Sequence, residues 1–204
     1  MFVKTFLPVI LASQSPRRKQ LLEWAEVPFE ILVSETDESY PENLTATAVA
    51  VHIARNKAIA VKSIVEKSET DKLNSAVPLT EKIILAADTI VVLENEIIGK
   101  PTNRADAIEI LKKLSGKKHQ VITGVVLLNA ANEIAFADTT EVEFYELDET
   151  QISFYVDKYK PYDKAGAYAI QEWIGVTGIK SINGDFYNVM GLPVSKVVQA
   201  LQKF

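Results

Sequence analysis

Apolar residues recur along this chain in two patterns, one typical of strands and one typical of helices. Continuous or alternating apolar runs predict strands over residues 8–12, 29–33, 82–93, 119–128 and 134–147. Helical spacing predicts helices that begin near residue 16, span about 45–67, 104–114 and 148–157, and follow residue 193. The polar residues 66–80 predict a surface loop. Because strands and helices alternate, the pattern predicts an α/β fold.

Turn signals add hairpins to this alternation. Asn183 and Gly184 predict a two-residue hairpin turn between strands over 178–182 and 185–189. Hairpins join antiparallel strands, so we expect a mixed twisted sheet flanked by helices rather than a purely parallel sheet. The chain has no repeat and no linker-like stretch, so residues 1–204 are expected to form a single domain.

Asp88 stands out because it lies inside the most apolar of the predicted strands. A buried ionised carboxylate is costly unless a cation or hydrogen-bond donors satisfy it. The strand is followed by a turn, and a three-residue turn would pair Leu93 with Ile97 and place Asp88 and Lys100 on one face. A two-residue turn would shift this register by one. Two interpretations stay open, a structural Asp–Lys pair and a functional carboxylate.

Lys57 interrupts the apolar stripe of the helix predicted over 45–67. The stripe consists of Val49, Ile53, Ala60, Val61 and Ile64. Lys57 follows Ile53 by four residues and precedes Val61 by four, so it belongs to the same face. A lysine in this position can extend its ammonium group to the surface, or it can reach a negative partner. The pattern leaves both interpretations open.

A motif that begins at Ser13, SQSPRR, connects the first predicted strand to the first helix. Pro16 suits the first helical position and Ser15 the cap, so Arg17 and Arg18 are expected in the first turn. Positive charge there costs roughly 0.3 to 1 kcal/mol per residue, but a bound anion reverses the effect. The motif is therefore a candidate phosphate site. The alternative is an ordinary capped helix whose arginines extend into solvent.

Composition narrows the classes of function. The chain has 204 residues, of which 48% are hydrophobic, as is typical of a globular protein. The net charge of -5 disfavours a nucleic-acid polymer or an anionic membrane as partner, and no apolar run reaches the roughly 20 residues that span a bilayer. The absence of cysteine excludes disulfides and thiolate chemistry and fits a cytoplasmic location. The two histidines, His52 and His119, are expected at the surface, so zinc is not expected.

The acidic stretch 34–38 predicts a loop that contains Asp37 and Glu38. Acidic loops are usually solvated. One of these two carboxylates is nevertheless a candidate to join Asp88 in holding a divalent cation, because magnesium and manganese near phosphates take oxygen ligands.

Six motifs together resemble the Maf family. They are residues 13–18 (SQSPRR), 54–58 (ARNKA), 87–89 (ADT), 99–101 (GKP), 163–168 (DKAGAY) and 187–193 (YNVMGLP). The resemblance implies a fold shared with inosine triphosphate pyrophosphatases. It also implies hydrolysis between the α and β phosphates of a nucleoside triphosphate, with Mg²⁺ or Mn²⁺, and is compatible with a homodimer. The family is also described as inhibiting septum formation.

With that reaction implied, each candidate residue receives an expected role. Asp88 is the expected general base or metal ligand, and Glu38 the expected second carboxylate around the cation. Further catalytic charge is expected from Lys57 and Lys100, and phosphate binding from Ser13, Ser15 and Arg18.

The family's dTTP/UTP branch is marked by three residues that this chain matches. They are Arg17, Thr89 and Gln171, which are therefore expected to set base specificity. Directly after Gln171 this chain has Glu172, where the family often has glycine. Two other functions stay open: a non-catalytic nucleotide-binding regulator of septum formation, and a pyrophosphatase aimed mainly at modified nucleotides.

Overall fold

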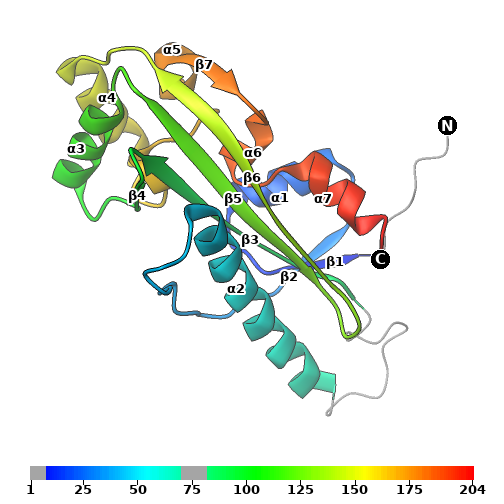
Figure 1. Cartoon of the computed structure of the whole chain (residues 1–204). Coiled ribbons are helices and arrows are strands. Elements are labelled where there is room, and N and C mark those ends of the chain that lie inside the picture. Colours follow the sequence, from blue (N-terminus) through cyan, green and yellow to red (C-terminus); the bar gives the residue numbers. More distant parts are fainter. Residues whose placement is uncertain (1–7, 70–81) are drawn as a thin grey trace.

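The computed structural model describes residues 8–69 and 82–204 and contains one seven-stranded sheet (Figure 1). Its strands are β1 (Val9–Leu11), β2 (Phe29–Ile31), β3 (Ile84–Leu93), β4 (Glu96–Ile98), β5 (Lys118–Leu128), β6 (Glu133–Phe144) and β7 (Ile179–Asn183). The order is β2-β1-β3-β5-β6-β7, with β4 also paired to β3. β1 runs parallel to β2 and β3, whereas the other pairs are antiparallel. The predicted mixed sheet is confirmed.

Helices cover both faces of this sheet. They are α1 (Pro16–Trp24), α2 (Ala46–Glu69), α3 (Arg104–Leu114), α4 (Glu149–Tyr159), the short 3-10 helix η2 (Ala165–Ala167), α5 (Trp173–Gly178), α6 (Phe186–Met190) and α7 (Val194–Leu201). α2 packs on one face, and α1, α3, α4 and α7 contribute to the core on the other (Figure 1). Among the helices described, none combines the length and apolar character needed to cross a bilayer.

Successive residues of β3 point to opposite faces, and this alternation places the candidate carboxylate. Ile84, Ala86 and Ile90 pack in the cores beneath α2, whereas Leu85 and Val91 pack in the larger core on the other face. Asp88 therefore points toward α2. Its neighbour in sequence, Thr89, points to the opposite face.

One edge of β3 is open between two partner strands. β1 pairs with Ile84 and Leu85, and β4 pairs with Val91 to Leu93. β5 pairs with β3 along the other edge from Ile84 to Val92. No described strand pairs with the open edge between these two partners, so side chains of neighbouring elements can reach Asp88 and Thr89 there.

Gly124 on β5 allows α2 to lie directly on the sheet. It is paired with Asp88, so a side chain at either position points to the same face. A Cβ atom at Gly124 would lie 2.2 Å from the carbonyl carbon of Ala50 in α2. Since no real Cβ contact is that short, this close approach depends on glycine.

Several sequence predictions are wrong in detail. Leu93 pairs with Glu96 rather than Ile97, across a two-residue turn in which Glu94 and Asn95 have φ of 52° and 72°. Positive φ at both central residues is typical of the type I′ turn that matches strand twist. On α2, Ile64 is exposed and Val65 is buried in its place.

The second predicted hairpin does not form. Residues 185–189 belong largely to α6, because the side chain of Asp185 accepts a hydrogen bond from the backbone N–H of Tyr187 and caps a helix. The predicted loop over 66–80 is also partly wrong, since α2 continues to Glu69; residues 70–81 lie outside the described part of the chain.

Candidate active site

A cavity of about 760 Å³ opens at the free edge of β3. Its lining includes residues 12–18, Asp88 and Thr89 of β3, and the segments 163–165 and 189–191. Elements far apart in sequence therefore meet at one place, and the six sequence motifs contribute to its wall or lie next to it.

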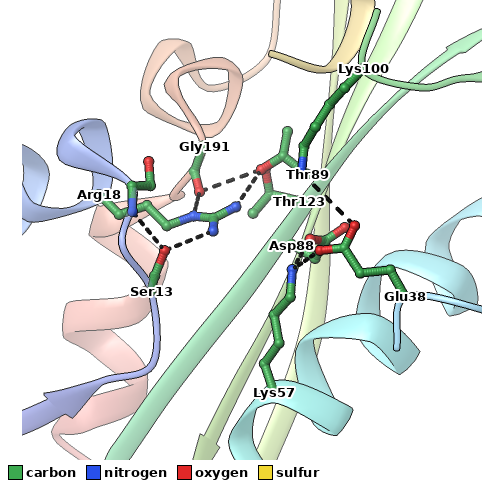
Figure 2. Close-up of polar contacts among 10 residues, drawn as sticks. Ser13, Arg18, Glu38, Lys57, Asp88, Thr89, Lys100, Thr123 and Gly191 are labelled. Carbon is green, nitrogen blue, oxygen red and sulfur yellow. Dashed lines mark hydrogen bonds and ion pairs between the residues drawn. The ribbon is translucent and has the colours of Figure 1, made fainter. Parts of the chain in front are cut away.

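On the α2 face lies a group that we call the carboxylate cluster: Glu38, Lys57, Asp88 and Lys100 (Figure 2). Lys57 Nζ lies 2.6 Å from Asp88 Oδ1 and 2.8 Å from Glu38 Oε1, and Lys100 Nζ lies 3.8 Å from Glu38 Oε2. The buried carboxylate of Asp88 is thus satisfied by Lys57. The expected register placed Lys100 on the same face as Asp88. Lys100 does lie in this cluster, but it contacts Glu38 and not Asp88.

Glu38 is the member of the acidic loop that reaches the cavity. The hydrogen bond from Lys57 lowers the pKa of Glu38, with the charges of Lys57 and Lys100 acting in the same direction against the opposing effect of burial. Asp37 instead accepts hydrogen bonds from the backbone and hydroxyl of Ser39. Of the two candidates, Glu38 is therefore the one placed beside Asp88 and Lys57.

On the opposite face of β3 lies the arginine cluster: Ser13, Arg18, Thr89 and Gly191 (Figure 2). Arg18 donates from Nε to the carbonyl of Gly191 at 2.8 Å, from Nη1 to Ser13 Oγ at 3.1 Å and from Nη2 to Thr89 Oγ1 at 3.1 Å. All three acceptors are neutral. Burial lowers the pKa of the Arg18 guanidinium, while the nearby charge of Asp88 acts in the opposite direction.

The two serines of the opening motif have different surroundings. Ser13 Oγ accepts hydrogen bonds from Arg18 and from the backbone N–H of Ser15. Ser15 occupies the position before α1 and lines the cavity, but its side chain makes no capping hydrogen bond. The helix start is therefore not closed by the predicted serine cap.

Arg17 belongs to a third charged group, whose other members, Asp163, Lys164 and Glu172, were not anticipated as site residues. Arg17 Nη1 lies 3.4 Å from Asp163 Oδ2, and Lys164 Nζ lies 2.8 Å from Asp163 Oδ1 and 3.6 Å from Glu172 Oε1. The Tyr155 hydroxyl also donates a hydrogen bond to Glu172. Lys164 is almost fully buried and lines the cavity. The available signal was a charged pair within an otherwise irregular segment rich in small residues.

Gln171 is not brought to the cavity. Its side chain is exposed and does not line the wall, although the wall segment ends two residues earlier at Ala169. Thr89 and Arg17, the other two residues expected to set specificity, both line the cavity.

His119 is buried, contrary to the expectation of a surface position. Its side chain is packed against Phe144 and Tyr168, and Nε2 lies 2.8 Å from the Tyr168 hydroxyl. Burial lowers the pKa of His119 from 6.5 to about 4, so the ring is neutral at physiological pH. His119 supports the cavity wall through Tyr168.

The donor chemistry of the carboxylate cluster fits magnesium or manganese. Asp88 and Glu38 each place one oxygen within hydrogen-bond distance of the same Lys57 nitrogen, so the two carboxylates face a shared space. The described residues contain no group of three acidic, histidine or cysteine side chains suited to a metal. Two carboxylates completed by phosphate oxygens and water form a usual magnesium environment.

Fold and site together define an α/β protein with a cavity that is lined by both cationic and acidic side chains. Five cationic side chains line it: Arg17, Arg18, Lys57, Lys100 and Lys164. A family model described as "Maf-like protein" matches residues 8–204, and the chain belongs to this family. The resemblance inferred from the six motifs is thus confirmed.

Relatives from several bacteria are similar over nearly the whole chain. A dTTP/UTP pyrophosphatase of Cytophaga hutchinsonii is 46% identical over 195 residues, which cover 96% of this chain and 83% of the relative. Proteins of the same name from Bacteroides thetaiotaomicron and Bacillus cereus are 45% and 44% identical, each covering 96% of this chain and 95% of the relative. Among solved structures, the Staphylococcus aureus Ham1 protein matches with a TM-score of 0.42 and 14% identity, over 68% of this chain and 72% of that chain.

Proposed function

We propose that this protein is a nucleoside triphosphate pyrophosphatase that hydrolyses dTTP and UTP to the monophosphate and pyrophosphate. Modified pyrimidine nucleotides are further candidate substrates. The observation that carries the proposal is the gathering of five cationic side chains around a buried aspartate in one cavity. The names of the similar bacterial proteins support the same reaction and the same bases.

The surroundings of Asp88 suit a general base that accepts a proton from water. Its Oδ1 accepts from Lys57, while Oδ2 has no hydrogen-bond partner among the described residues. In the proposed step, water attacks the α-phosphorus and passes a proton to Asp88. The bond from that phosphorus to the bridging oxygen breaks, and pyrophosphate leaves with the bond's electron pair.

Charge on the triphosphate is neutralised from both faces of β3. Arg18 with Ser13 and Ser15 would bind phosphate oxygens on one side, and Lys57 and Lys100 on the other. Each hydrogen bond to a charged group contributes roughly 1.5 to 3 kcal/mol, so a few of them suffice for tight binding.

Asp88 and Glu38 would hold the divalent cation, Mg²⁺ or Mn²⁺. When bound, the cation supplies charge neutralisation at the phosphates. Chelation with EDTA is expected to abolish turnover, and returning Mg²⁺ is expected to restore it. Turnover that is unaffected by chelation would remove the metal from this proposal.

Arg17, Thr89 and Gln171 are the proposed specificity residues. A glutamine amide can present an N–H donor and a carbonyl acceptor side by side, which matches the carbonyl and N–H edge shared by uracil and thymine. Gln171→Ala is expected to reduce the preference for UTP over CTP in kcat/KM more than it lowers kcat for UTP. Unchanged preference would exclude Gln171 from base selection.

The deciding experiment is incubation of the protein with UTP or dTTP and Mg²⁺, followed by separate assays for pyrophosphate and for inorganic phosphate. Pyrophosphate with UMP or dTMP supports the proposal. Nucleotide binding without product would favour the regulator of septum formation, which needs the cations but not Asp88. A panel that includes pseudouridine and 5-methyl nucleotides tests for preference toward modified substrates.

The cellular location and the oligomeric state of the protein are also proposals. A nucleotide-hydrolysing enzyme is expected in the cytoplasm, where its substrates are made. A homodimer is expected from the family, and analytical ultracentrifugation would measure it.

A further inference from the structure

Thr123 lies behind the arginine cluster and is fully buried. It is paired with Thr89 across β3 and β5, and the two hydroxyl oxygens lie 2.9 Å apart (Figure 2). Thr123 does not line the cavity, so it cannot touch a ligand there. Its hydroxyl also donates to the backbone carbonyl of Asn188 at 3.0 Å.

The chemistry of these groups fixes the direction of each hydrogen bond. A carbonyl oxygen only accepts, so the single proton of Thr123 is used by Asn188. Thr89 must then donate its own proton to Thr123 across the 2.9 Å contact. The lone pairs of Thr89 are left to accept from Arg18 Nη2 at 3.1 Å.

The reverse arrangement is less favourable. If Thr123 donated to Thr89, the Thr89 proton would have to go to the carbonyl of Gly191, which is 3.5 Å away. Hydroxyl hydrogen bonds in proteins span about 2.5 to 3.0 Å. The observed distances therefore favour a relay that runs from Arg18 through Thr89 and Thr123 to Asn188.

We propose that Thr123 is a positioning residue for Arg18. Its hydroxyl oxygen accepts the hydrogen bond that Thr89 donates, so that Thr89 can act toward the guanidinium only as an acceptor. A Thr89 proton turned toward Arg18 would oppose the guanidinium, whereas a lone pair holds it. It follows that Thr89 offers a ligand in the cavity an acceptor and not a donor. The proposal rests on the proposed phosphate-binding role of Arg18.

Neutron diffraction of the deuterated wild-type protein tests the polarity without any substitution. The expected deuterium of Thr123 lies toward Asn188 O and that of Thr89 toward Thr123. A Thr123 deuterium that points at Thr89 would overturn the relay. This measurement does not depend on whether the protein hydrolyses a nucleotide.

Substitutions test the positioning. Thr123→Val keeps the shape without the hydroxyl and is expected to raise both KM for UTP and Kd for inorganic tripolyphosphate about tenfold, with kcat within about twofold. Thr123→Ser keeps the hydroxyl and is expected to restore both constants. If Thr123 acts through Thr89, adding Thr123→Val to Thr89→Val changes nothing further.

Thr140→Val is the matched control, because it removes another fully buried hydroxyl that bonds Asp185 and Asn188 rather than Thr89. Any effect it has on KM is expected to persist in the Thr89→Val background. An effect of Thr123→Val that likewise persists there would overturn the proposal. Wild-type protein that binds tripolyphosphate but hydrolyses no nucleotide would reject the proposed function while leaving the relay measurable through Kd.

Discussion

The two faces of β3 present cations to the same cavity in opposite ways. On the α2 face, Lys57 lies between the carboxylates of Asp88 and Glu38. On the other face, Arg18 is held by a serine hydroxyl, a threonine hydroxyl and a backbone carbonyl, and no carboxylate among the described residues forms an ion pair with it. Two successive residues, Asp88 and Thr89, give the two faces their different acceptors.

This difference indicates a division of labour. An ammonium between two carboxylates has its charge compensated before any ligand arrives, whereas a half-buried guanidinium among neutral acceptors does not. We therefore expect Arg18 to gain most from an incoming phosphate. In the carboxylate cluster, Asp88 is paired with Lys57 and lies beside the place where water would be activated. We expect substitutions on the α2 face to act mainly on kcat and those on the other face mainly on KM.

The largest expected effect is that of Asp88→Asn. Loss of the proton acceptor is expected to lower kcat by about 10³-fold, as for other general bases, with Kd for tripolyphosphate changed by less than about threefold. Asp138→Asn is the control, because Asp138 is also buried and paired with a lysine, Lys196, but lies outside the cavity lining. Near-normal turnover in Asp88→Asn would contradict the expectation that the α2 face acts mainly on kcat.

His119 determines the pH range over which the comparison can be made. Its folded pKa of about 4 lies below the ordinary 6.5, so between these values the unfolded chain binds a proton that the folded protein excludes. The free energy of unfolding is therefore expected to fall by about 3 kcal/mol as the pH drops from 6.5 to 4. His119→Gln should remove this part of the dependence in urea unfolding measured at several pH values, and His52→Gln should not. Equal pH dependence in wild type and His119→Gln would show that the ring is accessible to protons.

Arg18→Lys sharpens the contrast between affinity and rate. The substitution keeps the charge but loses the fork that reaches Ser13, Thr89 and Gly191 together. KM for UTP is expected to rise about 10- to 30-fold with a smaller change in kcat, in steady-state kinetics. Arg55→Lys, at an ion pair with Glu133 away from the cavity, should leave both constants unchanged. A fall confined to kcat would place Arg18 with the chemistry instead.

Glu38→Gln is expected to have the smallest effect on the fold. The side chain is 48% exposed, so its pair with Lys57 contributes at most about 1 kcal/mol. Because the pKa of Glu38 is lowered, that contribution is present above its ordinary value of 4.5 and is lost as the pH falls below it. Unfolding of Glu38→Gln and wild type should therefore converge in acid. A Glu38→Gln enzyme with an unchanged Mg²⁺ requirement would exclude Glu38 as a ligand, and Asp37→Asn serves as the control for that requirement because Asp37 bonds Ser39 instead of Lys57.

Much of this site could be predicted because single residues violated their local pattern. Asp88 inside an apolar strand and Lys57 on an apolar stripe each needed a partner, and they turn out to be partners of each other. Predicting from sequence that Asp88 and Lys57 contact each other would have required knowing the distance between α2 and β3. That distance depends on a contact between Gly124 and Ala50, which are distant in sequence.

Other features could not be predicted because two local signals competed. Asn183-Gly184 is typical of a hairpin, but Asp185 directly after it caps a helix, and the helix forms. The hairpin register depended on a single residue in the turn after Leu93. For His119 a signal was present: alternation along β5 puts it on the same buried face as Val121.

Gly124 gives the site its clearance. A methyl group at this position would push against α2, because backbone atoms of Ala50 already occupy its volume. The helix would have to move away from the sheet, and Lys57 would move with it, away from Asp88. Gly124 does not line the cavity, but its lack of a side chain thus sets the distance between Lys57 and Asp88.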